Sequence, residues 1–110
     1  MILANKIALI TGASRGIGRE VAIEMAKAGA DIVINYIGDI NLALEVQGKV
    51  EALGRKAIII EADVSKLAAV EELLEKAIAA FGRVDILVNN AGITRDNLLA
   101  RMQEEDWDAL

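Results

Sequence analysis

Four short apolar runs recur along the chain at similar spacing, and none of them alternates with polar residues. They are Ile7–Ile10, Ile32–Ile34, Ala57–Ile60 and Val84–Val88. An unbroken apolar run of this length is typical of a strand that is buried on both faces, as in a parallel sheet. The runs therefore predict a parallel sheet that is covered by helices on both sides.

Helical patterns fill the intervals between these runs. We expect helices over Ile17–Ala28 and Asp39–Leu53, and a third that Ser65 caps and Gly82 ends. The order β-α-β-α-β-α-β, with right-handed crossovers, predicts one domain over residues 1–110 with an α/β, three-layer, doubly wound Rossmann-type fold and strand order 3-2-1-4. Because a loop and the start of another helix, "EEDWDAL", follow the last strand, we expect a truncated version of this fold.

Composition narrows the classes of function. The chain has 12 basic and 17 acidic residues, and the resulting net charge of −5 argues against a nucleic-acid surface. It has no Cys and no His, which excludes disulfides, thiolate or imidazole catalysis and most zinc sites, so we expect no metal site. Without a signal peptide or a membrane-spanning apolar run, the sequence predicts a cytoplasmic protein with no membrane partner.

The segment "LITGASRGIG" joins the first apolar run to the first predicted helix. Its glycines, Gly12, Gly16 and Gly18, have the spacing G-x-x-x-G-x-G. Glycine allows positive φ and a close approach of a pyrophosphate to the backbone, and a helix N-terminus directs N–H groups and a positive dipole end at phosphates. The turn thus predicts a nucleotide-binding site; the alternative is that the glycines only make a tight strand-to-helix turn.

Three motifs, in order, resemble the short-chain dehydrogenase/reductase family. They are the T-G-x-x-x-G-x-G turn that begins at Thr11, Asp63 after the third run, and the N-N-A-G motif at residues 89–92. The segments "VDILVNNAGITRDNLLARM" and "EEDWDAL" are most similar to bacterial 3-oxoacyl-acyl-carrier-protein reductases. The resemblance covers the N-terminal half of such an enzyme, and it implies NADPH-dependent reduction of a 3-oxoacyl-acyl-carrier protein in fatty acid synthesis as the parent reaction.

The candidate cofactor-binding residues lie in the glycine turn, at the ends of the second and third runs, and in the N-N-A-G motif. They are Gly12, Ser14, Arg15, Gly16, Ile17, Gly18, Asn35, Tyr36, Asp63, Val64, Asn90, Ala91 and Gly92. The resemblance implies that the turn contacts the ribose and pyrophosphate, that Asp63 and Val64 flank the adenine, and that residues 90–92 approach the nicotinamide-side ribose. For Asn89 the resemblance implies two roles of equal weight, contact with the cofactor and an internal brace of the sheet.

The second run indicates which cofactor is preferred. An NAD site usually has a carboxylate after this strand, whereas this chain has Asn35 and Tyr36. The guanidinium of Arg15, inside the glycine turn, is suited to pair with a 2′-phosphate. The sequence therefore favours NADP(H) over NAD(H). The alternatives are that Arg15 is a solvated surface charge, and that Asp39 weakens phosphate binding by facing the site.

The catalytic residues that the resemblance implies do not occur in the chain. They are a Tyr that donates a proton, a Lys four positions later, a Ser and an Asn. The single tyrosine is Tyr36, and Ile40 follows it at the position of the Lys. We therefore expect no activity from the chain alone. Another chain supplying the missing half, and an engineered or fragment Rossmann scaffold that self-associates without cofactor turnover, are the alternatives.

The fourth run also predicts self-association. In the expected strand order it has no neighbour on one side, so its unpaired N–H and C=O groups favour pairing with another copy. In and just before the second predicted helix, Ile37, Ile40 and Leu42 add apolar residues that are typical of an interface. The equally weighted alternative is ordinary sequence drift with local repacking. We expect a homodimer or higher oligomer through the fourth strand or the second helix.

Overall fold

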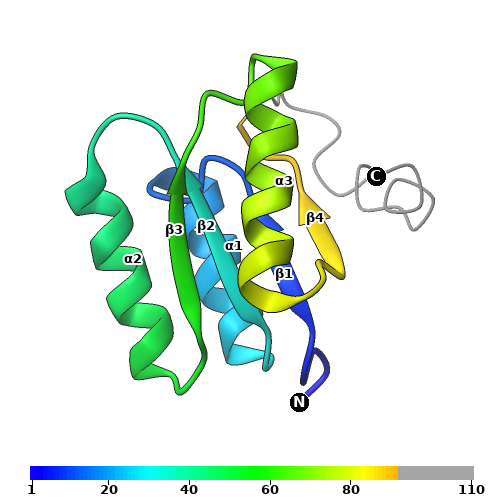
Figure 1. Ribbon diagram of the computed structural model, residues 1–110. Helices are drawn as coiled ribbons and strands as arrows, with labels where there is room; N and C mark the ends of the chain where they lie inside the picture. Colours follow the sequence, from blue (N-terminus) through cyan, green and yellow to red (C-terminus); the bar gives the residue numbers. More distant parts are fainter. Residues whose placement is uncertain (92–110) are drawn as a thin grey trace.

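The computed structural model describes residues 1–91 as a parallel sheet between two layers of helices (Figure 1). The strands are β1 (Ile7–Ile10), β2 (Asp31–Tyr36), β3 (Ala57–Glu61) and β4 (Ile86–Val88), and the helices are α1 (Gly16–Lys27), α2 (Ile40–Ala52) and α3 (Leu67–Phe81). The order across the sheet is β3-β2-β1-β4, and each neighbouring pair is parallel. This confirms the predicted doubly wound fold and its strand order.

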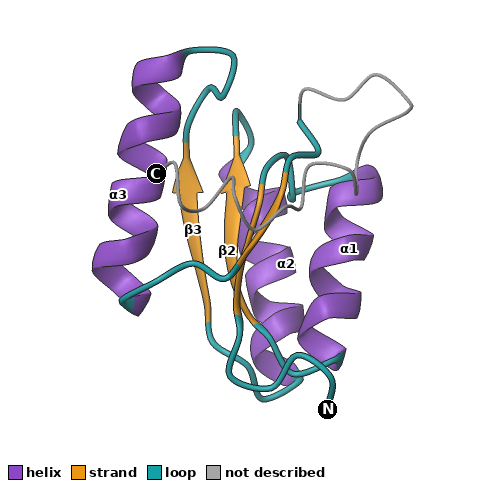
Figure 2. Cartoon of the chain, turned by 90° about the vertical axis from the view of Figure 1, so that its right-hand side faces the viewer, coloured by secondary structure: helices purple, strands orange, loops and turns teal. Residues whose placement is uncertain are grey.

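The two faces of the sheet carry different cores. Figure 2 shows α1 and α2 on one face and α3 on the other. Successive residues of a strand point to opposite faces, so Ile10 packs with the α1 and α2 side whereas Leu9 packs with the α3 side. In β2, Ile34 likewise packs on the α1 and α2 side and Val33 on the α3 side. This division explains why the runs are continuously apolar.

The predicted helix boundaries agree with the structure at most ends. The carboxylate of Asp39 accepts the Asn41 N–H at 2.8 Å and caps α2, and Gly82 ends α3 in the left-handed region, with φ 86°. The prediction that Ser65 caps α3 is wrong. Lys66 occupies that position and its side chain makes no capping bond, because the Ser65 hydroxyl donates to Asp63 instead.

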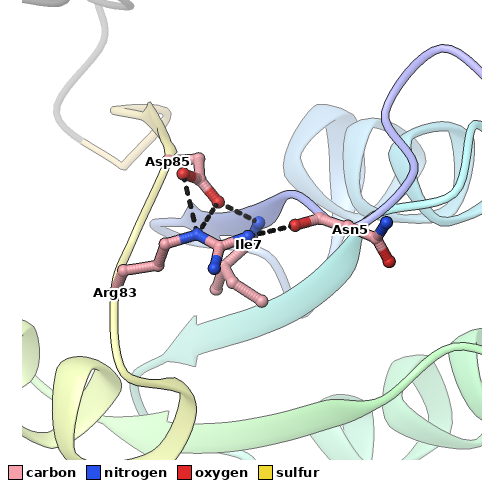
Figure 3. Close-up of polar contacts among 4 residues, drawn as sticks. All are labelled: Asn5, Ile7, Arg83 and Asp85. Carbon is pink, nitrogen blue, oxygen red and sulfur yellow. Dashed lines mark hydrogen bonds and ion pairs between the residues drawn. The ribbon is translucent and has the colours of Figure 1, made fainter.

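The last strand begins two residues later than predicted, at Ile86 rather than Val84. The reason is a polar network at the amino end of the sheet (Figure 3). The carboxylate of Asp85 accepts the Ile7 N–H at 2.8 Å and pairs with Arg83, whose guanidinium also donates to the Asn5 carbonyl. The Asp85 N–H also donates to the Ile7 carbonyl at 2.8 Å, so backbone and side-chain bonds together hold this part of the chain to β1.

Two predictions fall outside the described residues: the helix that begins at "EEDWDAL" and the position of Gly92. Within residues 1–91, no helix is long and apolar enough to cross a membrane.

Candidate cofactor-binding site

The three glycines of the turn are required for different reasons. Gly12 and Gly16 adopt φ values of 61° and 60°, a region that other residues rarely occupy. Gly18 is required by space, because a Cβ there would lie 2.3 Å from the Gly12 carbonyl oxygen and 2.6 Å from Asn90 Nδ2. A Cβ at Gly12 would lie 3.2 Å from Ala91, whereas one at Gly16 would meet nothing within 4 Å. The turn is therefore tightly packed at both ends and open at Gly16.

Hydrogen bonds fasten the glycine turn to the N-N-A-G motif. The Thr11 Oγ1 accepts the Ala91 N–H at 2.9 Å, and Asn90 Nδ2 donates to the Gly12 carbonyl at 3.2 Å. The Thr11 hydroxyl lies 3.4 Å from both the Val88 carbonyl and Asn89 Oδ1, either of which can accept its proton. Thr11 was not among the predicted site residues, although its place directly after a buried strand was a usable signal.

A pocket of about 270 Å³ lies between the glycine turn and the carboxyl ends of β2, β3 and β4. Its lining residues are Gly12, Asn35, Ile37, Ala62, Asp63, Val64, Ser65, Asn89 and Ala91. The structure therefore brings together five of the predicted residues, which are Gly12, Asn35, Asp63, Val64 and Ala91. Ile37 and Ser65 were not predicted as site residues; both directly follow segments that end in the pocket.

Asp63 places a negative charge in the wall of this pocket. Its Oδ1 accepts the Ser65 hydroxyl at 2.6 Å and the Ser65 N–H at 3.0 Å. These two bonds, the hydroxyl first, lower the pKa of Asp63 below its ordinary value of 3.8 because they stabilise the carboxylate. Asp63 is therefore ionised at neutral pH and suited to accept hydrogen bonds from a ligand.

A positive charge is exposed where α1 begins, at the other end of the glycine turn from Gly12. The first turn of α1 contains no acidic residue to offset its dipole. Arg15 is exposed at the N-cap position, and none of the ion pairs within residues 1–91 involves it. Arg19, by contrast, pairs with Glu45 of α2. Among the described residues, Arg15 is thus the cation of the turn that is free to bind an anionic ligand.

The remaining predicted residues differ in exposure. Ser14 is buried and Ile17 is 65% exposed. Tyr36 is 6% exposed and packs in the core on the α1 and α2 side, away from the pocket lining. Strand alternation places its side chain in this core, and its assignment as a cofactor-binding residue stays a prediction. Asn35 lines the pocket but is 1% exposed, and its amide is bonded to the backbone.

A family model described as short chain dehydrogenase matches residues 6–110. The chain belongs to the short-chain dehydrogenase family. The chain is 48% identical over 104 residues to the 3-oxoacyl-acyl-carrier-protein reductase FabG of Staphylococcus epidermidis, covering 94% of the chain and 43% of the relative. It is 44% identical over 108 residues to the corresponding reductase of a Synechocystis species, covering 98% of the chain and 44% of the relative.

Solved structures agree with this assignment. A short-chain dehydrogenase/reductase from Serratia marcescens matches with a TM-score of 0.81 and 33% identity, over 99% of this chain and 44% of its own. A hydroxysteroid dehydrogenase from Escherichia coli matches with a TM-score of 0.77 and 42% identity, over 83% of this chain and 38% of its own. The chain thus spans less than half the length of these relatives.

Proposed function

We propose that this chain binds a nicotinamide dinucleotide at the glycine turn, and NADP(H) more tightly than NAD(H). The observation that carries the proposal is the pocket between Gly12 and Asp63, with a glycine turn on one side and an ionised carboxylate on the other. A Cβ at Gly16 would occupy open space beside the N-terminus of α1, which fits the approach of a pyrophosphate to the backbone.

Each part of the dinucleotide has a proposed partner. The backbone of residues 12–18 would hold the pyrophosphate, and Asp63 with Val64 would flank the adenine. Asn90 and Ala91 would approach the nicotinamide-side ribose; Gly92, which lies outside the described residues, was assigned to the same part. When bound, the cofactor would supply a hydride. The chain's own contribution is to bind and orient it.

The preference for NADP(H) is supported by the charges around the end of β2. The side chain that ends this strand is Tyr36, so the carboxylate that binds a 2′-hydroxyl in NAD sites is not there. The nearby acids are engaged: Asp39 caps α2, and Glu61 Oε2 accepts the Gly38 N–H at 3.3 Å. The exposed guanidinium of Arg15 is the group proposed to pair with the 2′-phosphate.

We propose reduction of a 3-oxoacyl-acyl-carrier protein as the parent reaction, because the Staphylococcus epidermidis and Synechocystis relatives are named as reductases of that substrate. We further propose that this reaction belongs to fatty acid synthesis and takes place in the cytoplasm. We propose that the chain alone does not catalyse this reduction. Its single tyrosine is buried in the core, with Ile40 rather than a lysine four positions later. A phenol is an efficient general acid near neutral pH when its pKa is lowered toward that pH. The proton donor would therefore have to come from protein outside these 110 residues.

The binding proposal is tested by titrating the chain with NADPH and with NADH, following cofactor fluorescence. We expect saturable binding, tighter for NADPH. Arg15→Gln should weaken NADPH binding about ten- to a hundredfold and leave NADH binding unchanged, since a charge-assisted bond to phosphate contributes about 1.5–3 kcal/mol. Lys49→Gln, which removes an equal charge from the last turn of α2, is the matched control. Equal affinity of the wild type for both cofactors would contradict the NADP preference.

Turnover is tested separately, by NADPH oxidation with a 3-oxoacyl thioester. We expect none from this chain alone, and a rate above the buffer blank would contradict the proposed inactivity.

We also propose a homodimer or higher oligomer through β4 or α2. Among the described strands β4 pairs with β1 only. Near the start of α2, Ile37 and Ile40 are exposed as expected, but Leu42 is half-buried and Leu44 is exposed instead. Sedimentation at tens of micromolar protein tests this, and a monomer at about that concentration would contradict it.

A further inference from the structure

Asn35 is a buried amide at the place where the glycine turn, β2 and the end of β3 meet. Its side chain is 1% exposed. The other buried polar residues of the described chain, Thr11 and Ser14, both belong to the turn. An amide is buried at a cost unless its donors and its acceptor are paired, so a buried Asn at the end of a strand points to a specific set of partners.

The side chain of Asn35 finds these partners on two separate segments. Its Oδ1 accepts the Gly12 N–H at 3.1 Å, and its Nδ2 donates to the carbonyls of Ile60 and Ala62, both at 3.2 Å. The main-chain carbonyl of Asn35 also accepts the Ala13 N–H at 2.8 Å. Because an N–H can only donate and a carbonyl can only accept, these partners fix the orientation of the amide.

These contacts connect the two walls of the candidate site. Gly12 belongs to the turn, and Ala62 directly precedes Asp63 and Val64. We propose that Asn35 is a positioning residue, which sets the distance between the glycine turn and the Asp63–Val64 wall and so controls how tightly the site closes on its ligand. The consequence for affinity rests on the proposed function, whereas the coupling of the two walls does not.

The chemistry of the position selects asparagine. An aspartate of the same shape would accept from Gly12 but direct a carboxylate at the two carbonyls of Ile60 and Ala62, which repel it. An alanine would leave the Gly12 N–H and both carbonyls without this partner. The three backbone groups, which are one N–H and two carbonyls, require one acceptor and two donors on a short side chain, and asparagine supplies them.

The coupling is tested without ligand, by recording amide resonances and hydrogen exchange in Asn35→Ala and Asn35→Asp. We expect the Gly12 amide to exchange about tenfold faster, and the Ser65 amide, which is bonded to Asp63, to shift as well. Gln47→Ala is the matched control, because Gln47 Nε2 also donates to a β3 carbonyl, that of Ala57 at 2.9 Å, but at the far end of the strand. It should leave the Gly12 and Ser65 amides unchanged.

Shifts that stay within β2 in the Asn35 variants would overturn the proposal. If both variants fail to fold, the wild type decides: the side-chain amide protons of Asn35 should be protected from exchange, and exchange at the rate of a free amide overturns the proposal. In the presence of ligand, Asn35→Ala should weaken NADPH about tenfold, and Gln47→Ala should not. A wild type that does not bind NADPH refutes the proposed function only, because the amide measurements still decide the role of Asn35.

Discussion

The two ends of the sheet use similar hydrogen bonds for different results. At the amino end, Asp85 and Arg83 join β4 to the chain around Ile7, and the groups satisfy one another (Figure 3). At the carboxyl end, Thr11 and Asn90 join the same two strands. There, however, the bonds surround a pocket of about 270 Å³.

Glycine accounts for the difference. At the carboxyl end, Gly12 and Gly18 let the backbone pack closely while no side chain enters the space beside Gly16. At the amino end, the polar side chains interact with one another and with the backbone. The amino end thus contributes to stability alone, whereas the carboxyl end contributes to stability and, under the proposed function, to cofactor binding. Changes at the amino end should therefore lower the free energy of unfolding without changing cofactor affinity, whereas changes at the carboxyl end should affect both.

The largest effect is expected from Gly18→Ala at the carboxyl end. Its Cβ would lie 2.3 Å from the Gly12 carbonyl oxygen, which is backbone and cannot move aside cheaply. We expect a loss of about 1–3 kcal/mol in the free energy of unfolding, or more, and loss of NADPH binding. Urea unfolding and fluorescence titration measure the two quantities. Gly16→Ala, which meets only the cost of a positive φ of about 1–2 kcal/mol, should be milder, and the reverse order would contradict the packing argument.

Asp85→Ala tests the amino end. The substitution leaves the Ile7 N–H and the Arg83 guanidinium without their partner, so the free energy of unfolding should fall by about 1–3 kcal/mol. NADPH affinity, measured where the variant is fully folded, should not change. Glu24→Ala, which breaks the exposed pair with Lys27, is the control and should cost less than about 1 kcal/mol. A weaker NADPH affinity in Asp85→Ala would show that the two ends are not independent.

Gly48→Ala sharpens the comparison from a neutral site. Gly48 lies inside α2, and a Cβ there would meet nothing within 4 Å. Alanine in a helix interior is favoured over glycine by about 0.5–1 kcal/mol, so the melting temperature should rise. If stability and affinity are separable, the NADPH dissociation constant stays the same. A gain in affinity along with stability would count against that separation.

The smallest effect is expected from Ser65→Ala, which removes the hydroxyl bonded to Asp63. The pKa of Asp63 should rise toward 3.8, though not fully, because the Ser65 N–H remains. A carboxyl whose pKa is lowered by folding contributes stability above its ordinary pKa, and this is lost as pH falls through the lowered value. The variant should thus be slightly less stable at neutral pH and equal to the wild type in strong acid. NMR titration of the Asp63 carboxyl measures the pKa directly.

Much of the fold was predictable because buried parallel strands have a direct sequence signal. The same signal made β2 too short, because the apolar run stops at Ile34. The strand continues through Asn35 and Tyr36, and a polar residue such as Asn35 ends an apolar run without ending the strand. The signal also extended β4 to Val84, because the competing bond from the Asp85 side chain depends on Ile7, which is distant in the sequence.

Two parts of the candidate site were predictable. The spacing of the glycines predicted the turn, and the family resemblance identified Asp63. The role of Asn35 was not predictable, because it depends on three segments that meet only after folding. The capping prediction for Ser65 failed for a related reason. A nearby carboxylate, two residues away, competed for its hydroxyl, and propensity rules do not include such competition.

The bonds that fasten the glycine turn join residues 78 and 80 positions apart. On a growing chain, the turn leaves the ribosome long before Asn90 and Ala91 can fasten it. Contacts of such sequence separation form late and slowly, since loop closure must precede them. A ligand that binds only the fastened turn stabilises the whole domain by mass action, by about 2.7 kcal/mol at a hundred times its dissociation constant. Cofactor concentration in the cell would then set the yield of folded chain.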